Sequence, residues 1–237
     1  SQSYTLKVTD PASYPFRLPL TLSGYTGSSS LSQFPVLIEL NSSITGFSYN
    51  SFQSPKGDDL RFFTSDGEEL PYEIETWNLS GTSRIWVRSG IISGNSTVIT
   101  AAWGKSTDSS SPSYVADKSA WSNGYHGAWH FQNLVGSALA DSSPKNHQGT
   151  AEGDGVSVTI GQVGQAVTLD GSDDRVNLGR SAGNPGSVFT VSFWAKMGAG
   201  VNINEGDRIL SNKSSNNGTA GWNLYKGSSS TTRLYLK

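Results

Sequence analysis

The sequence contains no cysteine in 237 residues, which excludes disulfides, thiolate nucleophiles and cysteine metal ligands. Charged residues are also scarce, at 15%, and the net charge of -2 comes without any cluster of Lys and Arg. Nucleic-acid surfaces are built on such clusters, so we expect no nucleic-acid partner. No apolar run reaches the roughly 18 residues that a membrane span needs, so we expect no direct membrane insertion.

Glycine is abundant, with 27 residues, and turn-forming residues separate many short segments that alternate apolar and polar side chains. This pattern is typical of proteins with many short strands and few helices. A polar stretch without periodicity lies near the middle of the chain. We therefore expect an all-β protein with two consecutive antiparallel β-sandwich domains, at residues 1–106 and 125–237, joined by a linker at 107–124.

Strand patterns in the first half are bounded by clear turn signals. Asp66-Gly67 predicts a hairpin, and Pro15 and Pro19 predict that the strand at 14–22 is an edge strand or is interrupted. The other predicted strands span residues 34–40, 60–64, 70–77, 84–88 and 96–103. In this order the motifs resemble a bacterial family known only as domain of unknown function 2341, over about residues 14–105. The resemblance implies a β-sandwich in an envelope or surface protein and no established chemistry.

Three further strand-like motifs, at residues 128–131, 164–176 and 189–196, alternate apolar and polar residues in the second half. They resemble the laminin-G-like, concanavalin A-like jelly-roll family over about residues 125–237. The family fold has more strands than this sequence supplies, so we expect the jelly roll to look truncated. The resemblance implies binding of sugars or surfaces rather than chemistry.

Two glutamates, Glu73 and Glu75, lie two residues apart on one predicted strand and therefore share one face. Paired carboxylates carry out glycoside hydrolysis. Apolar Tyr72 and Ile74 occupy the opposite face, so we expect the glutamates to point to solvent rather than to act in catalysis. The three histidines lack zinc-site spacing, and no nucleophile elbow is present, so the sequence predicts no enzyme.

Acidic loops in the second half are the candidate metal site. Asp170, Asp173 and Asp174 lie in one short turn, and Asp141 belongs to a second loop rich in Asp and Asn. Calcium takes about six to eight oxygen ligands, which such loops supply, and the laminin-G-like resemblance also implies a structural Ca²⁺. The alternative is that these residues only form Asx-turns and hairpin tips.

Aromatic residues near turns or near the linker are the candidate ligand-binding residues: Trp77, Trp121, Tyr125 and Trp222. Exposed Trp and Tyr side chains stack on sugar rings. The alternative for each is packing between the two domains, which is the more common use of such residues.

These features predict a non-catalytic recognition module, secreted, on the cell surface or periplasmic, that binds carbohydrate or another surface polymer. One alternative is a structural or assembly domain of an adhesin, a surface fibre or an ExbB/TolQ-type envelope complex. Its partners would then be other copies or modules of a larger envelope protein. A second alternative is an accessory binding module of a polysaccharide-degrading enzyme.

Overall fold

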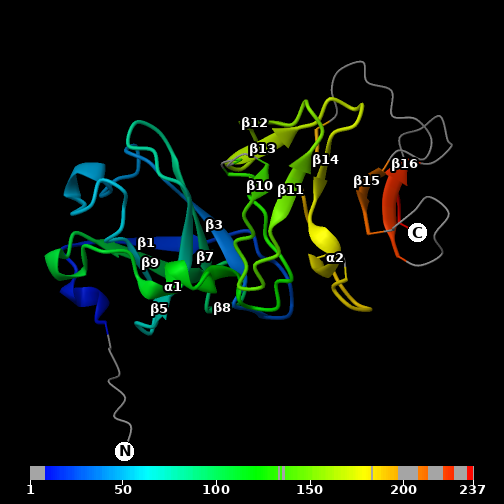
Figure 1. Ribbon diagram of the computed structural model, residues 1–237. Helices are drawn as coiled ribbons and strands as arrows, with labels where there is room; N and C mark the ends of the chain where they lie inside the picture. The colour runs from blue at the N-terminus through cyan, green and yellow to red at the C-terminus, as the bar shows by residue number, and fades with distance from the viewer. Residues whose placement is uncertain are drawn as a thin grey trace, which may run out of the picture.

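The computed structural model describes residues 9–132, 134, 137–182, 184–196, 208–212, 221–226 and 234–236. It is mostly β, with several small antiparallel sheets (Figure 1). Its two described α-helices, α1 (Ser113–Ala116) and α2 (Gly179–Ala182), have four residues each. Four short 3-10 helices complete the helical content: η1 (Pro11–Ser13), η2 (Tyr49–Ser51), η3 (Ser106–Asp108) and η4 (Ser119–Trp121). None of the described helices has the length and apolar character needed to cross a membrane.

Two antiparallel sheets build the first half of the chain. The four-stranded sheet has the order β1-β9-β4-β5 and contains β1 (Phe16–Leu22), β9 (Thr97–Trp103), β4 (Arg61–Thr64) and β5 (Glu69–Leu70). The three-stranded sheet has the order β3-β7-β6 and contains β3 (Pro35–Leu40), β7 (Ser83–Arg88) and β6 (Tyr72–Thr76). The short strands β2 (Leu31–Ser32) and β8 (Ile91–Ile92) pair separately.

The hydrophobic core lies between these two sheets, as their alternating side chains require. Ile85 and Val87 on β7 are fully buried, and Trp103 on β9 stacks on Phe52 with ring centroids 5.3 Å apart. Each fully buried large side chain contributes roughly 1.5–3 kcal/mol of hydrophobic stabilisation. The remaining buried members include Ile38, Leu40, Phe47, Leu60, Phe62, Leu70, Tyr72, Ile99 and Ala101.

The turn and edge predictions for this half are confirmed. The β4–β5 hairpin turns at Asp66-Gly67, where Gly67 has a φ of +85° and donates its N–H to the Thr64 carbonyl. The strand β1, which contains Pro19, lies at one edge of its sheet. Proline at an edge removes no hydrogen bond from the centre of the sheet, since its missing N–H is not needed there.

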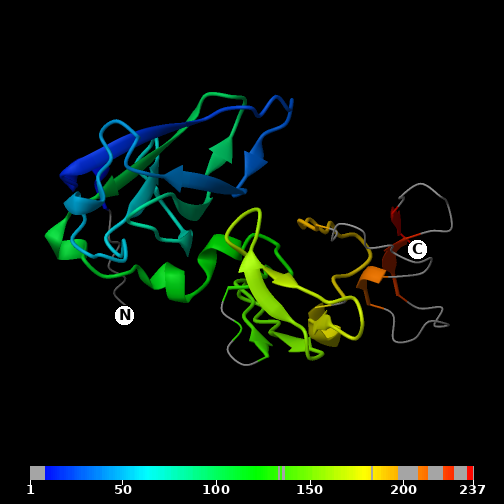
Figure 2. The same ribbon diagram turned by 90° about the horizontal axis from the view of Figure 1, so that it is seen from above.

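The expected linker at 107–124 packs against the first half. Tyr114, in α1, contacts Tyr72 edge to face at 5.7 Å and donates its hydroxyl to Glu69 at 2.9 Å. Trp121, in η4, is 6% exposed and contacts Trp86 of β7 at 5.4 Å. These contacts place η4 on the outer face of the three-stranded sheet, so the second half of the chain, residues 125–237, begins beside that face (Figure 2).

Three small sheets form the described part of the second half. The strands β10 (Ala138–Leu139), β11 (Gly149–Glu152) and β14 (Arg175–Asn177) form one sheet. A second sheet is the hairpin of β12 (Ser157–Ile160) and β13 (Gln165–Thr168). The strands β15 (Arg208–Ser211), β16 (Asn223–Lys226) and β17 (Leu234–Leu236) form the third. No jelly roll is identified in this part of the structure.

Two strands expected in the second half are irregular instead. Residues 128–131 contain no strand, because Phe131 has a left-handed φ of +57° that interrupts an extended backbone. Residues 189–196 are also irregular, since no described strand pairs with them. Apolar side chains of the second segment are exposed, including Val191 at 45% and Trp194 at 77%.

Candidate functional site

A β-bulge on β6 positions the two glutamates. Glu73 pairs with Trp86 and Ile74 with Ile85, but the register then moves to Thr76, so Glu75 is the extra residue. A bulge of this kind changes the direction of nearby side chains and is common at functional positions. Glu73 and Glu75 leave β6 on the outer face of the sheet, while Tyr72 packs into the core.

His130 from the second half lies between these two carboxylates. Its Nδ1 is 2.7 Å from Glu75 Oε2, and its Nε2 is 3.4 Å from Glu73 Oε2. The Glu75 side chain is 0% exposed, that of His130 is 14% exposed and that of Glu73 is 27% exposed. We call these three residues the Glu-His-Glu cluster. Because the cluster is largely buried, removing one of its charges leaves an opposite charge in the interior without a partner.

Neutral donors surround the Glu-His-Glu cluster. Trp86 donates its indole N–H to Glu75 Oε2 at 3.0 Å, and Trp121 donates its indole N–H to Glu73. From the second half, Ser142 donates its hydroxyl to Glu73 Oε1 at 2.6 Å. Gln132 donates its side-chain N–H to the backbone carbonyl of Glu75 at 2.6 Å. The contacts therefore join β6, β7 and η4 to residues that follow the linker.

The charges of the cluster stabilise one another. Burial by itself would lower the pKa of His130, but hydrogen bonds and attraction from Glu73 and Glu75 outweigh it and raise that pKa to about 9. Burial opposes ionisation of Glu75, yet His130, Gln132 and Trp86 hold its pKa below the usual value. At neutral pH the cluster therefore holds an imidazolium beside the ionised carboxylate of Glu75.

Gly164 closes the cluster on its remaining side. A Cβ atom at this position would lie 1.9 Å from Glu75 Oε1, and the φ of Gly164 is +63°. Glycine is suited to both requirements, because it has no side chain and adopts positive φ without steric cost. Glu75 Oε1 is buried and has no hydrogen-bond partner among the described residues. The backbone at Gly164 thus shields this oxygen from solvent.

The expectation that both glutamates point to solvent is wrong for Glu75. The alternation that placed it on the outer face is correct, but residues far along the chain cover that face. Glycoside hydrolysis needs two carboxyl groups that reach a sugar from either side. Glu75 does not reach a sugar in this arrangement, since its side chain is fully buried. The cluster can instead hold charge and dock the second half against β6.

The predicted ligand-binding aromatics do not form a common exposed surface. Trp77 is half-buried and contacts Tyr49 and Phe52 edge to face. Trp121 is buried beneath Trp86, and Tyr125 contacts Trp121 edge to face at 5.0 Å. Trp121 and Tyr125 pack at the junction, which is the alternative that the sequence left open, whereas Trp77 packs within the first half.

The other predicted aromatic, Trp222, is half-buried against Phe189 with ring centroids 5.2 Å apart. The most exposed large aromatic side chain lies elsewhere. Trp194 is 77% exposed, and its neighbour Phe193 is 46% exposed. Both belong to the segment 189–196, where a strand was expected and where no described strand pairs.

Four aspartates form an exposed acidic group in the second half. Asp170, Asp173 and Asp174 were predicted together, and Asp154 from the turn after β11 joins them. One oxygen of each lies within 4.8 Å of the others, so the group could hold a metal ion. Asp174 also accepts hydrogen bonds from the N–H groups of Gly155 and Asp170. Sequence reasoning missed Asp154 because β12 and β13 separate it from the others.

Asp141 does not belong to this acidic group, which corrects its assignment as a metal ligand. Its side chain is fully buried and accepts hydrogen bonds from the backbone N–H groups of Ala128, Ser143 and His147, and from the Ser143 hydroxyl. A carboxylate with this many donors organises its own loop. Asp141 therefore holds the start of the second half in place.

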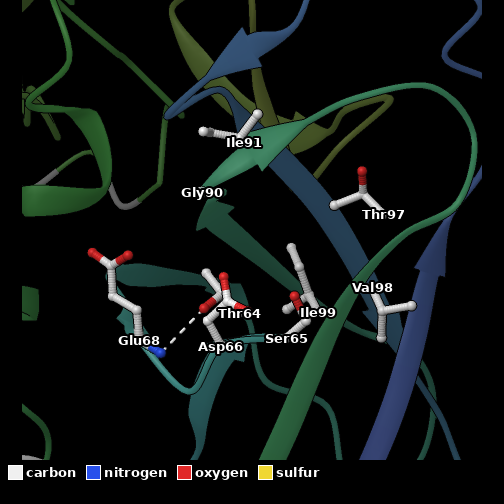
Figure 3. A pocket seen from close by; sticks show the side chains of 9 residues that line it. All are labelled: Thr64, Ser65, Asp66, Glu68, Gly90, Ile91, Thr97, Val98 and Ile99. Carbon is white, nitrogen blue, oxygen red and sulfur yellow. Dashed lines mark hydrogen bonds between the residues drawn. The ribbon is translucent and has the colours of Figure 1, made fainter.

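A shallow hollow of about 180 Å³ lies at the open end of the first-half sandwich (Figure 3). The turn that contains Asp66 and Glu68 forms one side, while Ile91 and Val98 form part of the other. Glu68 donates its backbone N–H to the Thr64 hydroxyl, as the dashed line shows. The hollow combines acidic and apolar groups and contains no histidine, so we assign it no chemistry.

Comparison with known proteins gave one match, to a family model. No curated protein and no solved structure matches the chain. A family model described as "Domain of unknown function (DUF2341)" matches residues 56–132, which include all three members of the Glu-His-Glu cluster. This confirms the first predicted resemblance in part, and the comparisons give no evidence for a laminin-G-like domain after it. Residues 56–132 of this chain thus resemble the DUF2341 family.

Proposed function

We propose that this chain is a non-catalytic recognition module of a secreted, cell-surface or periplasmic protein, and that it binds carbohydrate or another surface polymer. The observation that carries the proposal is the exposure of Trp194, at 77%, beside the half-exposed Phe193. An exposed indole ring offers an apolar face on which a sugar ring can stack.

The state of the Glu-His-Glu cluster supports the non-catalytic part of this proposal. Both carboxylates accept hydrogen bonds from tryptophan side chains, and the buried one also pairs with His130. General acid–base catalysis needs a group that reaches the reacting atoms. A cluster closed by Trp86, Trp121 and Gly164 is better suited to docking.

We also propose that residues 125–237 have a laminin-G-like, concanavalin A-like architecture. All of the described strand pairs in this half are antiparallel. Leu139 is the only described residue after position 125 among the buried apolar side chains, whereas Ile160, Val188 and Val191 are exposed. A second sheet packed across the side of the β12–β13 hairpin that carries Ile160, as in a jelly roll, would bury that residue.

Replacing Trp194 with alanine should weaken binding to the recognised polymer about tenfold or more, because truncating an aromatic anchor costs about 2 kcal/mol. The measurement is retention of the protein on a panel of insoluble polysaccharides and in affinity gels. Phe34→Ala is the matched control, since Phe34 is 47% exposed but lies in the first half. Equal retention of wild type and Trp194→Ala would remove the observation on which the proposal rests.

A structural Ca²⁺ at Asp154, Asp170, Asp173 and Asp174 is a further part of the proposal. Calcium at 100 times its Kd should raise the midpoint of thermal unfolding by roughly 5–10 °C, because it binds only the folded state. Asp173→Asn should abolish this increase. The control Asp117→Asn, an exposed aspartate in the linker, should retain it. If the midpoint shifts equally in both variants, the bound calcium lies elsewhere.

The exposed apolar residues of the second half favour one alternative, a structural or assembly role. Ile160 and Val188 are each more than nine-tenths exposed, and association with another module would bury them. Light scattering separates the two proposals: the recognition module stays monomeric, and the assembly domain forms a defined oligomer. In an accessory module of a polysaccharide-degrading enzyme, Trp194 would bind the substrate of that enzyme.

A further inference from the structure

We propose that the Glu-His-Glu cluster is a pH-sensitive latch, which holds the second half of the chain against β6 at neutral pH and releases it at alkaline pH. The inference depends on the contacts at the junction and not on the identity of any ligand. The DUF2341 match ends at Gln132, two residues after His130, so the latch holds the chain where it leaves that domain.

The two nitrogens of His130 face the two carboxylates. Nδ1 pairs with Glu75 at 2.7 Å, while the buried Nε2 lies 3.4 Å from Glu73 in an ion pair without a hydrogen bond, and both nitrogens carry a proton only in the imidazolium. If the proton on Nε2 leaves, the lone pair of that nitrogen faces the Glu73 carboxylate at 3.4 Å. An attraction then becomes a repulsion at the side of the cluster where Ser142 also binds.

The positive charges on the neighbouring elements are engaged with other groups. On β7, Arg84 pairs with Glu39 at 2.9 Å, and Arg88 donates to Ser122. Lys118, just before η4, donates to the carbonyl of Asp141 and to Asn146. In the second half, His126 and His147 contact each other with ring centroids 4.8 Å apart. Among the described contacts, His130 is therefore the cation that neutralises Glu73 and Glu75.

The direction of the pH effect follows from the pKa of His130, which the cluster raises from 6.5 to about 9. A raised pKa stabilises the docked state fully below about pH 6.5, and this contribution is lost as the pH rises through about 9. The lowered pKa of Glu75 matters at acidic pH. Ionised Glu75 stabilises the docked state fully above pH 4.5, and this stabilisation is lost as the pH falls through the lowered pKa. The latch is therefore closed at neutral pH.

Four tyrosines of the first half and the junction ionise only above the pH range of the latch. Burial raises the pKa of four tyrosines above the ordinary value of 10: Tyr14, Tyr72, Tyr114 and Tyr125. Two of them, Tyr114 and Tyr125, lie in or beside the linker that carries Trp121. A transition centred near pH 9 can therefore be assigned to His130 rather than to these side chains.

The absence of cysteine allows a direct distance measurement. Ser80→Cys in the first half and Ser157→Cys in the second place spin labels at two exposed positions on opposite sides of the latch. A second pair, Ser30→Cys and Ser80→Cys, reports on the first half alone. Pulsed electron spin resonance at about pH 7 and about pH 10 then gives the distance distribution of each pair.

We expect the pair across the latch to give one narrow distribution at neutral pH and a longer, broader one at alkaline pH, with a midpoint near pH 9. The pair within the first half should not change. His130→Gln should abolish the pH dependence between these values, while His126→Gln should retain it. An unchanged distance in the wild type, or the same transition in His130→Gln, would overturn the proposal.

A second measurement covers the case in which His130→Gln does not fold. The titration of His130 in the wild type can be followed by nuclear magnetic resonance of its imidazole ring. The latch requires the midpoint of that titration to coincide with the midpoint of the distance change. Two separate midpoints would mean that another group opens the junction, and the proposal would fail. Neither readout uses glycan binding, so failure of the latch is distinct from failure of the proposed function.

Discussion

Replacing Glu75 with alanine should destabilise the docked state by about 3–5 kcal/mol, the usual cost of breaking a buried ion pair. Glu75 is fully buried, and its removal leaves His130 without its closest counter-charge and Trp86 without an acceptor for its indole N–H. Urea unfolding followed by tryptophan fluorescence measures the loss, because Trp86 and Trp121 both report on the junction.

The matched control is Glu39→Ala. Glu39 lies on β3, an edge strand of the three-stranded sheet that also contains β6. Glu39 pairs with Arg84 at 2.9 Å, but its side chain is 51% exposed and that of Arg84 is 32% exposed. Exposed pairs of this kind contribute about 0–1 kcal/mol. Similar losses in Glu39→Ala and Glu75→Ala would show that burial does not give the cluster a special role.

The second large effect is expected for Gly164→Ala. The new methyl group would lie 1.9 Å from Glu75 Oε1, far inside the van der Waals contact distance, so either the carboxylate or the backbone must move. A non-glycine residue at a φ of +63° costs roughly 1–2 kcal/mol in addition. We expect a total loss of about 3 kcal/mol or more in the free energy of unfolding, with release of the second half measured by limited proteolysis.

Gly171→Ala separates these two contributions. Gly171 has a φ of +85°, and nothing lies within 4 Å of the position that its Cβ atom would occupy. The substitution therefore carries the backbone cost alone, roughly 1–2 kcal/mol. If Gly171→Ala and Gly164→Ala lose the same stability, the contact between Gly164 and Glu75 is not important for docking.

Local patterns were sufficient to predict most of the first half. The turn signal Asp66-Gly67 predicted the β4–β5 hairpin correctly. This feature depends on residues within a few positions of each other, so a sequence pattern contains it. The same is true of Pro19, whose missing donor restricts β1 to a sheet edge.

The junction could not be predicted in the same way, because its partners are far apart in the chain. Alternation shows that Glu75 faces away from the core, but not that His130 and Gly164 cover it. Trp86 lies on the outer face of the sheet, where it contacts Trp121 of η4. The sequence contains a carboxylate pair, a histidine and a glycine at these positions. They are far apart in the chain, so no local pattern shows that they contact one another.

The second half departed furthest from expectation. A strand is stable only when another strand pairs with it, so the alternation in residues 189–196 was not sufficient. The acidic group was easier to predict. Three of its four members lie in one turn, and the sequence analysis predicted them together. Close spacing in the sequence was therefore the feature that made a candidate site predictable.

A double-mutant cycle between Glu75 and His130 tests the central claim, that these residues act together to dock the two halves. The free energy of unfolding is measured by urea for wild type, Glu75→Gln, His130→Gln and the double variant. Docking through the cluster predicts a coupling energy of about 1–3 kcal/mol, since the two side chains are in direct contact. Losses that add within about 0.5 kcal/mol would contradict it, because they would mean that each residue acts independently.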